Sequence, residues 1–267
     1  IRTKEGGDVV PLDIRRRTSQ QQWVRSTLQQ LEEEDFARQI WLKDRQRGGS
    51  TCACSWCAHR CLLHKNTNGL ILAHDKDTAK ELFVMVQTFH RHLEPAFRPM
   101  VKHDTLEGLV FDNPDSKDAI TNPGLGSRVF IGTAGNIHAG VGRTLHAVHL
   151  SECARYKKPE ELQAAIFDAV PLKNRSLIIM ESTAFYNPES RWFKTICEDT
   201  IKKKRYTPWR FVFVPWNHDA DCRIALREGE DLEYTTEERE VMRDFHLTPE
   251  QVKWRRYKLG EFQGEVD

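Results

Sequence analysis

Short apolar runs alternate with longer segments of helical periodicity along most of this chain. The runs predict strands at about 38–43, 69–74, 109–112, 127–133, 145–152, 176–180 and 209–216. The intervening segments predict helices at about 19–34, 52–65, 76–93, 159–168 and 189–203. This alternation is typical of an α/β protein with a mainly parallel, doubly wound central sheet flanked by helices.

The composition changes after Trp216. Residues 227–240 are strongly acidic, and Thr248 followed by Pro249 is a natural start for a last helix through Trp254. We therefore expect a core at 1–216, including a loose N-terminal lead-in, and a small helical lid or linker at 217–267.

A glycine turn follows the first predicted strand. Gly48-Gly49-Ser50-Thr51 stands between that strand and a helix, an arrangement in which backbone N–H groups and the positive helix end can cradle a phosphate. A hydroxyl of Ser50 or Thr51 can hold Mg²⁺. The lysine that usually precedes the hydroxyl is replaced by Gly49, and positive charge comes earlier, at Lys43, Arg45 and Arg47. A purely structural strand-to-helix turn remains the alternative.

Two further strands end in polar residues. Ser151 and Glu152 follow one of them, and Glu181-Ser182-Thr183 follow another. Because ligands of open α/β sheets bind at the carboxyl ends of strands, Glu152 can polarise a water for attack on a phosphate. We expect Glu152 and the Gly48 turn to lie on two neighbouring strand tips. A solvated strand end is the alternative for Glu152.

The cysteines and the net charge limit other functions. Cys52, Cys54, Cys57 and Cys61 crowd one predicted helix, and we favour a buried helix face over a zinc site because no second cluster is present. With 40 Lys and Arg against 39 Asp and Glu, nucleic acid could be bound only by local patches. One candidate patch is Lys202, Lys203, Lys204 and Arg205, and another is Arg255, Arg256 and Lys258. No apolar run approaches the roughly 20 residues of a membrane span.

Taken in order, these motifs resemble those of the ATPase domain of a tailed-bacteriophage large terminase. The matching segments are 43–51 (Lys-Asp-Arg-Gln-Arg-Gly-Gly-Ser-Thr), 72–79, 142–144 (Gly-Arg-Thr), 148–152 (Val-His-Leu-Ser-Glu), 181–184 (Glu-Ser-Thr-Ala) and 247–256. The resemblance implies a P-loop ATPase fold in which the loop lysine is absent or moved. It implies a DNA-packaging motor that hydrolyses ATP with Mg²⁺.

The resemblance also implies roles for individual residues. The ATP-binding (Walker A) set is Lys43, Arg45, Gln46, Arg47, Gly48, Gly49, Ser50 and Thr51. The catalytic set is Glu152, Arg45 and Arg143, the last as an arginine finger that reaches a neighbouring subunit. Ser50, Ser151 and Glu152 (the last two in the Walker B position) would hold Mg²⁺, and Ser182 and Thr183 would couple hydrolysis to movement.

The partners implied are double-stranded DNA, a portal protein and a small terminase subunit. We expect a homo-oligomeric ring on the procapsid in the host cytoplasm, possible monomers in isolation, and no membrane contact. A C-terminal nuclease domain, present in such proteins, is expected to be missing from this chain. Two alternatives remain open at this point: a helicase-like nucleic-acid ATPase, and a degenerate nucleotide-binding assembly protein without turnover.

Overall fold

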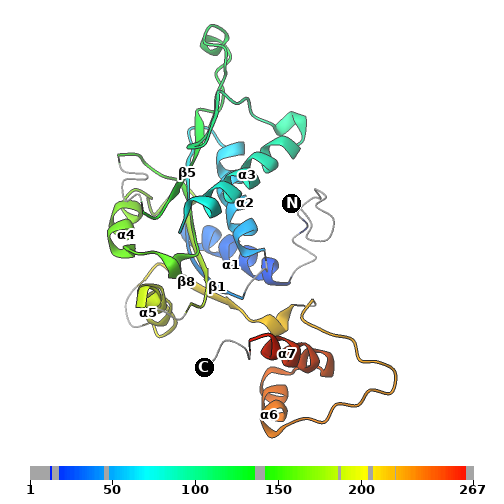
Figure 1. Cartoon of the computed structure of the whole chain (residues 1–267). Coiled ribbons are helices and arrows are strands. Elements are labelled where there is room, and N and C mark those ends of the chain that lie inside the picture. Colours follow the sequence, from blue (N-terminus) through cyan, green and yellow to red (C-terminus); the bar gives the residue numbers. More distant parts are fainter. Residues whose placement is uncertain are drawn as a thin grey trace.

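A central β-sheet with helices on both faces organises this protein (Figure 1). The computed structural model describes residues 13, 18–44, 48–135, 142–185, 188–203, 207–219 and 221–262. The strands are β1 (Phe36–Lys43), β2 (Asn68–Ala73), β3 (His103–Thr105), β4 (Gly108–Phe111), β5 (Ser127–Thr133), β6 (Ala147–Ser151), β7 (Ser176–Thr183) and β8 (Arg210–Val214). The α-helices are α1 (Thr18–Glu34), α2 (Gly49–Leu63), α3 (Lys76–His92), α4 (Pro159–Phe167), α5 (Arg191–Ile201), α6 (Thr236–Phe245) and α7 (Pro249–Phe262).

The strands form one eight-stranded sheet in the order β3-β4-β5-β2-β6-β7-β1-β8. The pairings from β5 through β8 are parallel, whereas β3-β4 and β4-β5 are antiparallel. The predicted mainly parallel α/β sheet flanked by helices is therefore confirmed. The carboxyl ends of β1, β6 and β7 lie along the same edge of the sheet because these strands run in the same direction.

The sheet has one hydrophobic core on each face. Helices α1, α2 and α3 cover one face, where Trp41, Ile71 and Ile179 point. Helices α4 and α5 cover the other, where Leu150 and Met180 point. Figure 1 shows the two helical layers on opposite sides of the sheet. Since side chains alternate along a strand, residues two apart in β1, β6 or β7 share a face.

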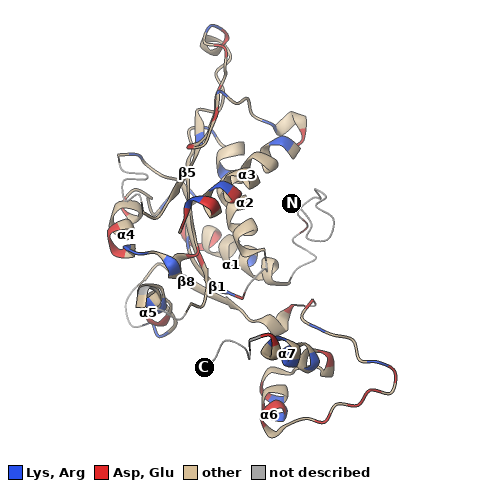
Figure 2. Ribbon diagram, viewed as in Figure 1, with Lys and Arg blue, Asp and Glu red and all other residues tan. Residues whose placement is uncertain are grey.

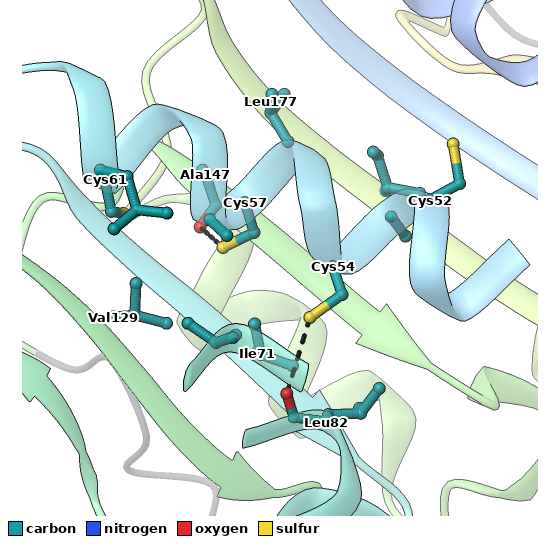
Figure 3. Packing of buried hydrophobic residues seen from close by; sticks show 14 of the residues in the cluster. Cys52, Cys54, Cys57, Cys61, Ile71, Leu82, Val129, Ala147 and Leu177 are labelled. Carbon is teal, nitrogen blue, oxygen red and sulfur yellow. Dashed lines mark hydrogen bonds between the residues drawn. The ribbon is translucent and has the colours of Figure 1, made fainter. Parts of the chain in front are cut away.

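The cysteine-rich helix α2 is a core helix, as we expected. All four of its cysteines are buried, and Figure 3 shows them between the sheet and neighbouring helices. Cys54 Sγ donates to Leu82 O at 3.7 Å, and Cys57 Sγ donates to Ala147 O at 3.5 Å. Burial raises the pKa of Cys52 to about 12, so its thiol stays protonated. The small side chains let α2 pack close to the strands.

Several element boundaries differ from those expected. Helix α2 begins at Gly49 rather than Cys52, so Ser50 and Thr51 lie in its first turn. Strand β7 continues to Thr183, three residues beyond the apolar run. The periodicity of the acidic segment did not predict α6, whose Thr235–Glu238 capping box defines its start.

Helices α6 and α7 lie together below the sheet in the view of Figure 1. Arg256 binds Glu238 through two nitrogens at 2.7 and 2.8 Å, and Trp254 stacks on Trp216 with 5.0 Å between ring centroids. The Gln251 side chain donates to Asn217 O at 2.7 Å, which joins α7 to the end of the core. The domain division at residue 216 stays a prediction.

Charged residues of both signs are spread over the surface, including α6 and α7 (Figure 2). This agrees with the nearly balanced charge of the sequence. None of the helices in the described ranges combines the length and apolar character that crossing a membrane requires.

The close packing of α2 on the sheet can be tested at Gly69. A Cβ at this position would lie 2.6 Å from Cys61 Sγ and 2.9 Å from Cys57 Sγ. We expect Gly69→Ala to lower the free energy of unfolding by about 1–3 kcal/mol through overpacking, as measured by urea denaturation. Adding Cys61→Ala should recover part of the loss; strictly additive destabilisation in the double variant would contradict this packing.

Candidate functional site

The N-terminus of α2 opens at the carboxyl edge of the sheet. Gly48 caps the helix in a left-handed conformation (φ 70°, ψ 22°) and has no side chain to accept from the first amides. The first intrahelical bond runs from Cys52 N to Gly48 O at 2.9 Å. The amides before Cys52 therefore lack intrahelical acceptors, and together with the helix dipole they favour an anion.

Lys43 lies directly beside this helix end. A Cβ on Gly49 would lie 2.5 Å from Lys43 Cδ and 3.2 Å from Trp23 Cη2, so the second glycine makes room for the lysine stem. Trp23 itself is buried and stacks on Trp41. The Lys43 ammonium forms ion pairs with Glu181 Oε2 at 2.9 Å and with Glu152 Oε1 at 3.1 Å. One positive charge thus joins the tips of three strands.

Glu181 is the most enclosed charge of the site. Its side chain has no exposed surface, and its Oε1 accepts from Ser151 Oγ at 2.8 Å. Glu181 Oε1 also lies 3.2 Å from Nε2 of the buried His149. Because a carboxylate oxygen only accepts, His149 Nε2 is the donor in this contact. A buried carboxylate is stable only when it is paired and hydrogen-bonded, and Glu181 meets both conditions.

Glu181 and Lys43 keep each other ionised. Burial works to raise the pKa of Glu181, but the charge of Lys43 and the contact with His149 overcome it and leave that pKa far below its usual range. Burial also works to lower the pKa of Lys43, yet the carboxylates of Glu181 and Glu152 raise it above its ordinary value. The site therefore holds a fixed ammonium at neutral pH.

Glu152 sits where β6 ends, in a left-handed backbone conformation (φ 55°, ψ 49°) that is uncommon for a residue with a side chain. Its Oε2 accepts from Ser182 Oγ at 3.4 Å and from Thr183 Oγ1 at 3.5 Å. The carboxylate is one-fifth exposed, so a ligand can reach it. Strained conformations of this kind cluster at functional sites.

The expectation of two neighbouring strand tips is wrong. Strand β7 lies between β1 and β6, with Glu181 opposite both Trp41 and Ser151. Lys43 bridges the extra strand spacing, because its long side chain reaches Glu181 on β7 and Glu152 beyond β6. The insertion of β7 is also what brings Ser182 and Thr183 beside Glu152.

The structure describes only some of the other residues that the sequence predicts to bind nucleotide. Ser50 and Thr51 lie in the first turn of α2, and Ser151 is buried with its hydroxyl donating to Glu181. Arg45, Gln46 and Arg47 lie outside the described residues. Arg143 is exposed, and its guanidinium lies 4.3 Å from the centroid of the Phe130 ring.

The predicted basic patches differ in how they are paired. In the first, Lys202 pairs with Glu198 at 3.2 Å, Lys203 is exposed, and Lys204 and Arg205 lie outside the described residues. In the second, each of the three cations has its own carboxylate on α6 or α7; the pairs are Arg255–Glu237, Arg256–Glu238 and Lys258–Glu261. The first two pairs join α7 to α6, whereas the third lies within α7.

Sequence reasoning missed two residues of the site, Glu181 as a buried anion and His149 as its partner. A usable signal was present in the alternation of β7, where Glu181 follows Ile179 on the inward face. A charged residue in a buried strand requires a counter-charge nearby. His149 stands two residues before Ser151 and so shares its face.

The described residues include no group of three or more His, Cys, Asp or Glu side chains that could hold a metal ion by themselves, so a divalent cation at this edge would need further ligands from a bound molecule. In the part of the chain that the structure describes, the single positive charge of Lys43 faces two carboxylates, which leaves one negative charge at the accessible Glu152. Carboxylate and hydroxyl oxygens are the ligands that Mg²⁺ prefers. Glu152 and Ser50 offer such oxygens at this edge, whereas Glu181 is enclosed and already neutralised.

Comparison with known proteins supports the fold. No protein-family model matches the sequence, and no curated protein matches it. The structure is similar to the large terminase of bacteriophage HK97, with a TM-score of 0.57 and 16% identity over 84% of this chain and 43% of that one. It is also similar to the large terminase ATPase domain of Thermus phage P74-26, with a TM-score of 0.50 and 15% identity over 71% of this chain and 80% of that one. The chain therefore has the fold of phage large terminase ATPase domains, and it spans less than half of the HK97 protein.

The backbone at Glu152 gives a test that is independent of ligand. We expect Glu152→Gly to be more stable than Glu152→Ala by about 1 kcal/mol, because glycine adopts the left-handed region without a Cβ penalty. Both variants remove the carboxylate, so guanidinium denaturation of the pair isolates the backbone effect. Equal stabilities would mean that Glu152 is not held in this conformation.

Proposed function

We propose that this chain is the ATPase domain of a large terminase, which hydrolyses ATP to move double-stranded viral DNA into a procapsid. One observation carries the proposal: the α2 N-terminus, the Lys43 ammonium and the accessible Glu152 carboxylate meet at one edge of the sheet. These are the groups that bind a triphosphate and activate a water. The fold likeness to terminase ATPase domains is consistent with it.

Lys43 takes the place of the missing loop lysine in this proposal. The α2 amides and the Lys43 ammonium bind the phosphates, with Arg45, Gln46 and Arg47 completing the cradle. Phosphate oxygens compete with Glu152 for Lys43, so nucleotide binding frees the Glu152 carboxylate to orient the attacking water. Mg²⁺ held by Ser50 and Glu152, with Ser151 behind them, would neutralise charge on the phosphates.

In this proposal Ser182 and Thr183 respond to the state of Glu152. Both hydroxyls are within hydrogen-bond distance of Glu152 Oε2, and β7 is hydrogen-bonded to β1, which pairs on its other edge with β8, the strand before the lid. We infer that a change at Glu152 reaches the lid by this route. DNA would be held through its backbone, since a motor must ignore sequence, with 202–205 as one contact.

The assembly and location belong to the same proposal. The domain would act within a homo-oligomeric ring, with a portal protein and a small terminase subunit, in the host cytoplasm. A nuclease domain would lie outside this chain. A helicase-like ATPase would share the fold, and a strand-separation assay distinguishes it.

A second candidate is a nucleotide-binding assembly protein without turnover. The observation that favours it is the double engagement of Lys43, which pairs with Glu181 and Glu152 at once. Ser151, in place of an acid at the end of β6, agrees with it. Stoichiometric binding of ATP without phosphate release would select this function.

Glu152→Gln tests the catalytic assignment. We expect steady-state ATP hydrolysis to fall by about 10²-fold or more, because an amide cannot accept a proton from water, while the affinity for a non-hydrolysable ATP analogue is retained. Glu161→Gln, an exposed carboxylate on α4, is the matched control and should leave both values unchanged. Wild-type turnover in Glu152→Gln would remove the assignment.

Arg143→Ala tests the role of Arg143 across subunits. We expect ATP hydrolysis by assembled motors to fall by about 10³-fold or more, since the guanidinium would stabilise charge on a neighbouring subunit's nucleotide. The slow hydrolysis of the dilute monomer should not change. An equal loss in monomer and assembly would place Arg143 in its own subunit's site.

A further inference from the structure

Glu181 is a charge that the proposed chemistry does not use. It lies on the α2 face of β7, has no exposed surface, and cannot itself reach solvent or an incoming water. Its two oxygens divide their contacts: Oε2 pairs with Lys43 at 2.9 Å, and Oε1 accepts from Ser151 and contacts His149. A carboxylate in this position is costly to bury, so stability alone does not account for it.

The neighbouring strand supplies a further reason. At the end of β6, Ser151 offers a hydroxyl but no charge, and Glu181 is the residue directly opposite it on β7. The enclosed anion next to Lys43 therefore comes from β7, the middle strand of the three, whereas the second anion, Glu152, is partly exposed. From β7, Glu181 holds the ammonium by an ion pair, while the stem of Lys43 lies against Gly49.

We propose that Glu181 is a positioning residue of the nucleotide site, whose buried carboxylate holds Lys43 at the α2 N-terminus and provides the negative charge that Ser151 lacks. This rests on the proposed function, because the ligand that Lys43 meets is a nucleotide phosphate. The two carboxylates on Lys43 then have different tasks. Glu152 is accessible and exchanges its contact for phosphate, whereas Glu181 is enclosed and keeps its contact in both states.

The test compares nucleotide affinity in Glu181→Gln and wild type. A fluorescent non-hydrolysable ATP analogue is titrated with Mg²⁺ and, separately, with EDTA. We expect a loss of about 10- to 100-fold in affinity in Glu181→Gln under both conditions, because Lys43 loses its fixed partner. Circular dichroism melting establishes that each variant is folded. Unchanged affinity in folded Glu181→Gln overturns the proposal.

Two variants separate positioning from general stability. Ser151→Asp combined with Glu181→Gln moves the carboxylate by one strand spacing, about 5 Å, and should recover part of the affinity. A double variant that binds no better than Glu181→Gln would overturn the charge argument. Asn113→Ala is the control: Asn113 is buried after β4, away from the site, and its side chain donates to Asp118 and to Asn122 O, so its loss should lower the melting temperature without changing affinity.

The remaining outcomes are also decisive. If Glu181→Gln does not fold, the comparison passes to Glu181→Met, which removes the charge at a similar side-chain length; wild-type affinity in that folded variant would overturn the proposal. If wild-type protein fails to bind the analogue at all, the proposed function is wrong. If wild type binds and Glu181→Gln binds equally, only the role of Glu181 is wrong.

Discussion

The site depends on the two ion pairs that the ammonium of Lys43 forms with Glu181 and Glu152. This ammonium is buried beside the first turn of α2 and balances carboxylates from two different elements. Without it, Glu181 would be an unpaired charge inside the sheet, which costs far more than a single contact returns. The glycine at position 49, the stacked Trp23 and Trp41, and the insertion of β7 between β1 and β6 all serve to place this one group.

The fold could be predicted from the sequence wherever apolar runs were bounded by clear breaks. The predicted ends of strands β1, β2 and β5 and of helix α3 lie within two residues of the observed ends. Strand β2 is buried on both faces and therefore forms a continuous apolar run, whereas α3 is marked by helical periodicity of its buried residues. The start of α2 was missed since Ser50 and Thr51 read as a loop. Helix α6 was missed because its charged face outweighs its few apolar residues.

The site could be predicted only as a set of strand ends. Polar residues after Lys43 and after Leu150 mark the correct edge of the sheet, but the order of strands is a property of the whole chain. The strand order places β7, with Glu181, between β1 and β6. Lys43 on β1 must therefore reach past β7 to contact Glu152 at the end of β6. Ser182 was predicted to act in coupling, and its contact with Glu152 follows from the same order.

The four cysteines of α2 have a mechanical meaning for a site at the helix end. Cys54 donates to Leu82 O on α3 and Cys57 donates to Ala147 O on β6. Cys57 and Cys61 both lie against Gly69 of β2, where even a methyl group would not fit. A helix seated in this way cannot slide along the sheet or roll on it without opening gaps in a densely packed interior. The N-terminal end of α2 is therefore fixed on the sheet, and a movement near it would have to arise in the segments that surround it.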